Sequence, residues 1–168
     1  MRDIAAIVYT SNTGFTMRYA QMLGQAAAIP VYDLEDGLSA PASGANVLYL
    51  GWLSAGKIKG LSRARKQWKI RAVCAVGMSP GGAEVLSRVT KGNQLDGLPV
   101  FYLPGGYAPE KLTGVPKLMM WAMTKAVTRK PPQNAEEAAM QEAFRSGCDF
   151  VAEQNLAPVL DWLREKTD

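Results

Sequence analysis

Residues 4–16 read IAAIVYTSNTGFT, and this stretch decides the fold. The run Ile4–Tyr9 is short and apolar, which predicts a buried β-strand. Hydroxyl-bearing residues and Gly14 follow directly, and they favour a tight turn. From Phe15 the apolar side chains recur at helical spacing, so a helix is expected over residues 15–28. A strand that passes through a short polar loop into a helix is typical of the opening unit of an α/β fold.

The same alternation continues along the chain. Apolar strands that alternate with helices indicate a parallel sheet covered on both faces. Five such strands in about 100 residues predict a doubly wound five-stranded parallel sheet with the strand order 2-1-3-4-5. The expected strands are residues 4–9, 30–33, 47–51, 72–76 and 99–103, and the expected helices are residues 15–28, 57–67, 83–89, 135–146 and 155–166.

The simple pattern stops after Pro104 and returns only in the last helix. We interpret residues 107–150 as a helical elaboration of one domain that spans residues 1–168, because no linker sets them apart. Within the elaboration, residues 117–125 read KLMMWAMTK. One interpretation is an extra helix packed on the domain, since Met fills irregular gaps. The other is an interfacial or quinone-facing helix, with Lys near lipid headgroups and Met and Trp in the acyl boundary.

The amino-acid composition excludes several kinds of catalytic and metal site. The chain of 168 residues has no His, which excludes imidazole-based catalysis and His-ligated metals. Its two cysteines, Cys74 and Cys148, lie far apart, which argues against zinc ribbons, iron–sulfur clusters and a disulfide framework. We therefore expect a cytoplasmic protein. The start at Met1 enters an apolar run too short for a signal peptide, and no apolar stretch reaches 18 residues.

Charge is unevenly distributed. Between Gly37 and Ala83 the chain carries basic residues and no acidic ones, although its formal net charge is only +4. These residues are either an ordinary solvated face or a docking surface for an acidic partner or an anionic membrane. Trp68 is the only aromatic residue among these basic residues, so nucleic acid is not expected as a partner. The basic residues are Lys57, Lys59, Arg63, Arg65, Lys66, Lys69 and Arg71.

The loop after the first strand predicts an anion site. It offers several hydroxyls, a glycine that permits close backbone approach, and the N-terminus of a helix, whose dipole favours an anion. The alternative is an ordinary helix cap, for which Ser and Thr are also preferred. A dinucleotide fingerprint is absent after this strand, and Ile58 replaces the hydroxyl of a P-loop in residues 51–58. The predicted phosphate-binding residues are Ser11, Asn12, Thr13, Gly14, Phe15 and Thr16.

In residues 11–16 the chain resembles the flavodoxin-like family, whose phosphate loop reads [ST]-x-T-G-x-T. Two further segments, Gly51–Gly56 (GWLSAG) and Leu103–Tyr107 (LPGGY), are similar to the branch of that family that includes menaquinone-dependent protoporphyrinogen oxidase. The resemblance implies a flavodoxin-like fold and FMN as the cofactor. It also implies that the flavin ring lies between the loops after the third and fourth strands.

Aromatic side chains stack on flavin rings, and backbone groups bond the polar edge. Trp52 is the first stacking candidate and Tyr107 is the second. Ser54 and Gly56 follow the third strand, and Gly56 can bring backbone close to the ring. Ser79 and Gly81 follow the fourth strand and can bond its pyrimidine edge.

Three functions fit these residues. The first is electron transfer to a redox partner protein that docks on the basic residues. The second is an FMN-dependent oxidoreductase with a quinone acceptor, for which the resemblance suggests protoporphyrinogen as substrate. The third is a flavin-free binding module on the same fold. Bound cofactor separates the first two from the third.

Overall fold

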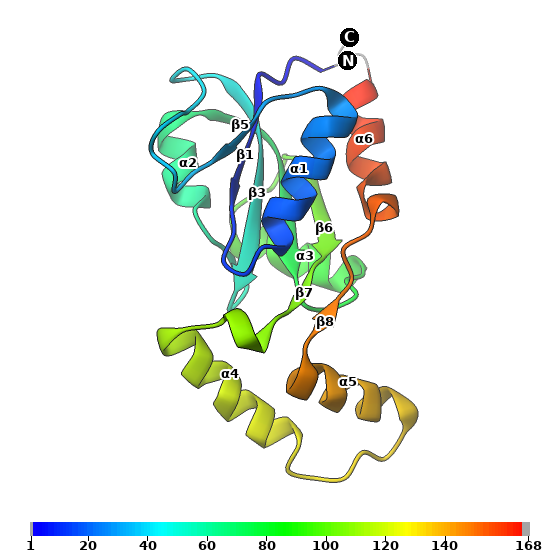
Figure 1. Cartoon of the computed structure of the whole chain (residues 1–168). Helices are drawn as coiled ribbons and strands as arrows, with labels where there is room; N and C mark the ends of the chain where they lie inside the picture. Colours follow the sequence, from blue (N-terminus) through cyan, green and yellow to red (C-terminus); the bar gives the residue numbers. More distant parts are fainter. Residues whose placement is uncertain (1, 166–168) are drawn as a thin grey trace. The chain divides into compact units, whose positions relative to one another are not determined.

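The computed structural model describes residues 2–165. Its main sheet has five parallel strands in the order β2-β1-β3-β5-β6, which confirms the predicted flavodoxin-like doubly wound fold (Figure 1). A short strand, β4, pairs antiparallel with β3 beside this path. The strands are β1 (Ala6–Thr10), β2 (Val31–Asp33), β3 (Asn46–Ser54), β4 (Lys57–Ile58), β5 (Lys69–Gly77) and β6 (Val100–Pro104).

The chain forms two compact units. The first comprises the residues up to Gly105 and those from Val151 onward, and the second is Gly106–Phe150. The first unit contains the whole parallel sheet and its covering helices. That these units make up one domain stays a prediction.

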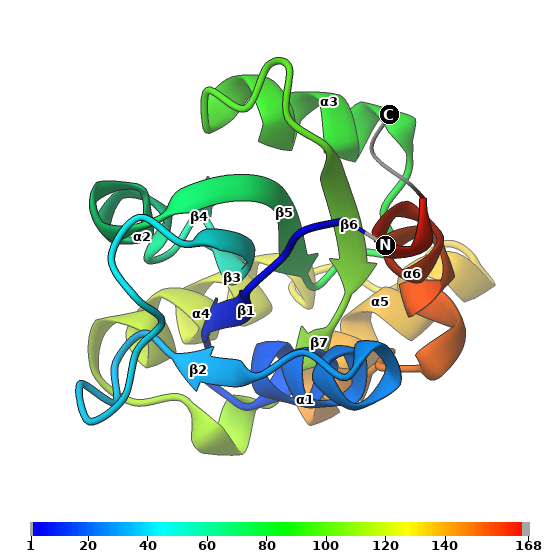
Figure 2. The same ribbon diagram turned by 90° about the horizontal axis from the view of Figure 1, so that it is seen from above.

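Each face of the sheet carries its own core. Side chains alternate along a strand, so Ile7 and Tyr9 of β1 join one core while Ala6 and Val8 join the other. Helices α1 and α6 cover the first face, and α2 and α3 cover the second (Figure 2). The helices of this unit are α1 (Phe15–Ala27), α2 (Leu61–Gln67), α3 (Ala83–Gly92) and α6 (Ala157–Arg164), and the 3₁₀ turn η2 (Glu153–Leu156) precedes α6.

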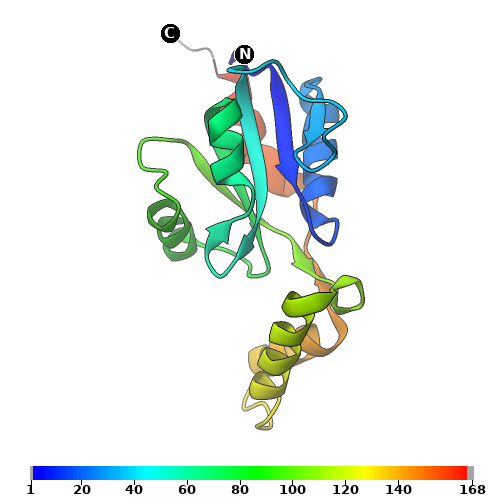
Figure 3. The same cartoon turned by 90° about the vertical axis from the view of Figure 1, so that its left-hand side faces the viewer.

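The sheet register places the strand ends side by side. Thr10 pairs with Gly51 between β1 and β3, and Trp52 pairs with Val76 between β3 and β5. Strand β2 lies on one side of β1 and β3 on the other, so the strand order changes direction at β1 while the strands stay parallel. Open α/β sheets bind ligands outside the carboxyl ends of the strands at such a switch point. Figure 3 shows the loop after β1 and the β3–β4 hairpin at this same end of the sheet.

The structure corrects the helix predicted over residues 57–67. Strand β3 continues to Ser54 and folds back, so that Leu53 pairs with Ile58 and Ser54 with Lys57. Gly60 then has φ +76°, a left-handed conformation that a helix interior does not allow, and α2 begins only at Leu61. The basic side chains at helical spacing gave no sign of this pairing with β3.

Other boundaries differ by a few residues. Strand β1 begins at Ala6 and not at Ile4, and α3 continues to Gly92. The predicted last helix is divided into η2 and α6, because Pro158 favours the first turn of a new helix. Its predicted end at Lys166 lies outside the described residues.

The second unit is a helical hairpin closed by two short strands. Strands β7 and β8 pair antiparallel, with Tyr107 opposite Cys148. The Thr124 hydroxyl of α4 donates to the Phe144 carbonyl of α5 at 3.3 Å. Asn134 caps the start of α5, where its side chain accepts from the Glu137 amide at 2.8 Å. Its elements are β7 (Gly106–Tyr107), η1 (Pro109–Lys111), α4 (Gly114–Val127), α5 (Ala135–Ser146) and β8 (Cys148–Asp149).

Candidate functional site

The loop between β1 and α1 presents an open helix N-terminus. Gly14 is the N-cap residue of α1 with φ +100°, and no side chain in residues 2–165 caps this end. Apart from its chain neighbours, no described atom lies within 4 Å of the position that a Gly14 Cβ would take. The first amides of a helix have no partner within the helix. An anion can therefore approach the backbone here, where the helix dipole favours it.

The predicted phosphate residues differ in exposure. Asn12 is exposed, Ser11, Thr13 and Gly14 are half-buried, and Phe15 is half-buried against the core below α1. The Ser11 hydroxyl accepts a hydrogen bond from the Gly14 amide at 3.2 Å, which holds the loop in shape. Thr16 is only 1% exposed. The structure thus brings Ser11, Asn12, Thr13 and Gly14 to the surface together and turns Thr16 inward.

A buried hydrogen-bond pair lies below this loop. The Tyr49 hydroxyl donates to the Lys59 carbonyl at 2.6 Å, so its 2.8 Å contact with Thr10 is a bond that the Thr10 hydroxyl donates. Burial raises the pKa of the Tyr49 hydroxyl, which therefore keeps its proton as a donor. Gly60 is packed against both hydroxyls and leaves no room for a Cβ. These contacts fix the end of β1 to the segment after β4.

The β3–β4 hairpin carries three of the predicted ring-binding residues. Trp52 is half-buried, and the Lys59 ammonium lies 5.8 Å from its ring centroid. Ser54 is half-buried at the end of β3, and Gly56 is exposed in the turn with φ +76°. The hairpin covers Gly51, since a Cβ there would lie 2.5 Å from Ile58 Cγ2. Trp52 follows the residue paired with Thr10, which places it next to the start of the loop between β1 and α1.

Asn93 fixes this hairpin, and the sequence reasoning missed it. Its side-chain amide donates to the Gly56 carbonyl at 2.9 Å and to the Val89 carbonyl at 2.8 Å. Its side-chain carbonyl accepts from the Ile58 amide at 2.9 Å. Asn93 is buried directly after α3, so one side chain joins that helix to the turn of the hairpin at Gly56 and to β4 at Ile58. The only signal in the sequence is an Asn after a helix, which is ordinary for a helix end.

The loop after β5 is bound to Tyr102. The Tyr102 hydroxyl donates to the Ser79 carbonyl at 2.8 Å, so the Ser79 hydroxyl is the donor in its own 2.9 Å bond to Tyr102. Gly81 has φ +95°, and a Cβ there would lie 2.6 Å from Tyr102 Cδ1. Ser79 is exposed and Gly81 half-buried. The structure places both beside the carboxyl end of β5, with Tyr102 as their support.

Tyr107 belongs to the second unit. It is buried, and its ring packs against Phe144 with the centroids 6.3 Å apart. The Cys148 backbone pairs with Tyr107 across β7 and β8. Tyr107 therefore belongs to another unit than the candidates of the parallel sheet, and its part in ring binding stays a prediction.

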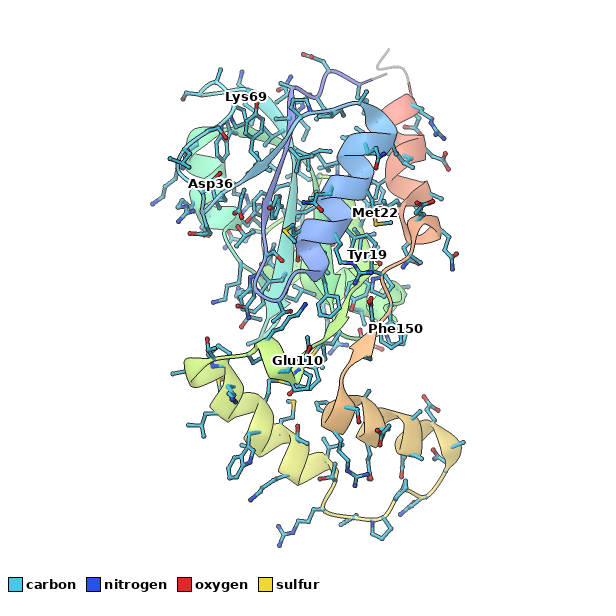
Figure 4. All side chains as sticks on the ribbon, in the orientation of Figure 1. Tyr19, Met22, Asp36, Lys69, Glu110 and Phe150 are labelled. Carbon is cyan, nitrogen blue, oxygen red and sulfur yellow. The ribbon has the colours of Figure 1, made fainter. Side chains whose placement is uncertain are left out.

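The basic residues between Gly37 and Ala83 lie toward both ends of the sheet. Arg65 donates to the Asn93 and Gln94 carbonyls at 3.2 and 2.8 Å, where a cation is favoured beside the C-terminus of α3. Arg63 pairs with Glu35 at 3.0 Å. Lys69 is the first residue of β5 (labelled in Figure 4), whereas Trp52 lies near the carboxyl end of the sheet. A nine-residue strand spans roughly 30 Å, so the segment is divided between two ends of the sheet.

Three further findings concern a cavity, metal binding and membrane spanning. A cavity of about 370 Å³ lies between the loop after β2 and α2, where Tyr32, Asp33, Glu35, Arg63 and Trp68 line it, and it includes none of the predicted site residues. Within the described residues, no group of three or more His, Cys, Asp or Glu is placed to hold a metal ion. None of the described helices is both long and apolar enough to cross a bilayer.

Comparisons with known proteins leave the family open. No known protein-family model matches the chain, and no curated protein sequence matches it. The site must therefore be judged from its own geometry. An open, uncapped helix start at the switch point fits a phosphate group, and a half-buried Trp beside it fits a flat aromatic ring.

Proposed function

We propose that this chain is an FMN-binding redox protein that acts in electron transfer or flavin-dependent oxidoreduction. The observation that supports it best is the open N-terminus of α1, directly after β1 at the switch point. When bound, FMN supplies the one- and two-electron redox chemistry. The chain would bind FMN and control access to it, and each residue is given the part that its side chain or backbone can chemically perform.

The phosphate would be held by the loop Ser11–Gly14 and the first amides of α1. Asn12 and Thr13 reach the surface and can donate side-chain hydrogen bonds. Ser11 already accepts from the Gly14 amide, which leaves its own hydroxyl hydrogen for a ligand oxygen. Thr16 would shape the loop from inside, because its side chain is buried.

The ring would lie on the hairpin side of this loop. Trp52 would stack on it, with the ammonium of Lys59 favouring negative charge nearby. The backbone around Ser54 and Gly56 would approach its edge on a hairpin that Asn93 fixes. Ser79 and Gly81 would approach from the loop after β5. Tyr107 lies in the second unit, and its part in ring binding stays a prediction.

Within the proposal, an electron carrier and a quinone-linked oxidoreductase of the protoporphyrinogen oxidase type share this site. Steady-state turnover of a small reductant with a quinone separates them. The flavin-free module is favoured by one observation, namely that Ser79 and Gly81 are already engaged by Tyr102. A cytoplasmic location is also part of the proposal, because Cys74 and Cys148 are free thiols.

The experiment is FMN binding followed by absorbance of the protein peak after gel filtration. We expect flavin bands to elute with the protein. Asn12→Asp should weaken FMN binding about tenfold, because charges ~4 Å apart near a protein surface interact by ~1–4 kcal/mol. The matched control is Asn134→Asp in the second unit, where Asp is an equally good cap and adds the same charge. A protein that elutes colourless, with both variants identical to the wild type, would contradict the proposal.

A further inference from the structure

Helix α4 presents its large apolar side chains to solvent. Val115, Leu118 and Met119 are 69%, 64% and 63% exposed, and Trp121 and Met123 are about half exposed. Every residue of α4 is at least partly exposed. Outward helix faces are ordinarily polar, and a continuous exposed apolar surface marks an interaction site.

The side of α4 that faces α5 is a different one. Thr124 donates to the Phe144 carbonyl across the hairpin, and Met120, Thr124 and Val127 are the half-buried positions. At 100° per residue, Val115, Leu118 and Met119 lie on the opposite side of the helix. The α4–α5 packing therefore leaves the apolar face uncovered.

Every charged residue from Lys111 to Ala135 is basic, and there are five of them. At 100° per residue, Trp121 and Lys125 border the apolar face on the side of Leu118, and Lys117 lies further round the helix, near the position of Thr124. The Lys125 ammonium lies 4.1 Å from the Trp121 ring centroid. The five are Lys111, Lys117, Lys125, Arg129 and Lys130.

We propose that α4 lies in the surface of an anionic lipid membrane. Its 14 residues span about 21 Å, which is shorter than the roughly 30 Å hydrocarbon core, so the helix would lie in the interface plane. Apolar side chains on one side and Lys with Trp at its border are the features of such helices. A second copy of this chain fits less well, because two identical basic faces repel each other.

The test uses the full chain and sedimentation with vesicles of phosphatidylcholine, with and without phosphatidylglycerol. We expect binding to the anionic vesicles that weakens with salt. Leu118→Glu should abolish it, whereas Leu38→Glu, an exposed Leu in the first unit, should leave it unchanged. Lys117→Gln with Lys125→Gln should reduce binding about 25-fold, since each basic residue near an anionic surface is worth roughly a factor of five.

A second double variant tests whether the basic residues between Gly37 and Ala83 bind the membrane instead of α4. Lys66→Gln with Lys69→Gln removes the same charge from the first unit and should change binding little. Equal loss in both double variants, or unchanged binding by Leu118→Glu with an unaltered circular dichroism spectrum, would overturn the proposal. A dimer in light scattering that Leu118→Glu makes monomeric, with no binding to vesicles, would assign the face to a second copy and overturn it as well.

Discussion

Replacing Asn93 with Ala should destabilise the first unit more than replacing any other Asn or Gln of that unit with Ala. The side chain makes three hydrogen bonds from a buried position, to the Gly56 and Val89 carbonyls and from the Ile58 amide. Each bond contributes about 1 kcal/mol net, so their loss amounts to ~3 kcal/mol. Ile58 is 5% exposed, so its amide would have little access to water as a replacement partner.

The assay is urea unfolding followed by tryptophan fluorescence and circular dichroism. With a slope of roughly 1–3 kcal/mol per molar urea, a loss of ~3 kcal/mol should lower the midpoint by about 1–3 M. The matched control is Asn46→Ala, which removes one exposed hydrogen bond to Asp3 and should cost less than about 0.5 kcal/mol. Equal shifts in the two variants would refute the assignment of Asn93 as the side chain that fixes the hairpin.

Three further outcomes follow from the buried groups. Gly60→Ala should cost about 2–4 kcal/mol in urea unfolding, because φ is +76° and a Cβ would meet both the Tyr49 and Thr10 hydroxyls; a loss below 0.5 kcal/mol would contradict this. Burial raises the pKa of Tyr49 above its unfolded value near 10, so the contribution of Tyr49 to stability should be constant below pH 10 and be lost as the pH rises above it. In Tyr49→Phe the free energy of unfolding should fall less steeply with pH above 10, and an unchanged slope would contradict this role of Tyr49. In native protein a thiol reagent should label Cys148 slowly and leave the buried Cys74 unlabelled until urea is added; rapid double labelling would show that the sheet core is open.

The sheet order was predictable because each strand is a short apolar run with its own flanking turn. Ile4–Tyr9 shows this best, since both faces of β1 are buried and the run needs no alternation. The helix predicted over residues 57–67 is confirmed over residues 61–67 and wrong over residues 57–60, because basic side chains at helical spacing are compatible with a hairpin as well. The positive φ of Gly60 and the pairing of β4 with β3 decide that segment, and both depend on tertiary contacts.

In the candidate site, too, local features were predictable from the sequence and features that depend on tertiary contacts were not. The loop Ser11–Gly14 was identifiable from hydroxyls and a glycine before a helix, since local backbone chemistry determines its form. The inward position of Thr16 depends on how α1 packs on the sheet. Asn93 and Tyr102 act through residues 37 and 23 positions away, and a single sequence carries no signal for such pairs.

The central claim is that the loop after β1 holds the phosphate of FMN. The most direct measurement compares the dissociation constants of FMN and riboflavin, which differ only by that phosphate, by quenching of flavin fluorescence. We predict that FMN binds at least 100-fold more tightly, and that Asn12→Asp reduces this ratio while riboflavin affinity stays constant. Equal affinities for the two flavins, or binding of neither, would contradict the account.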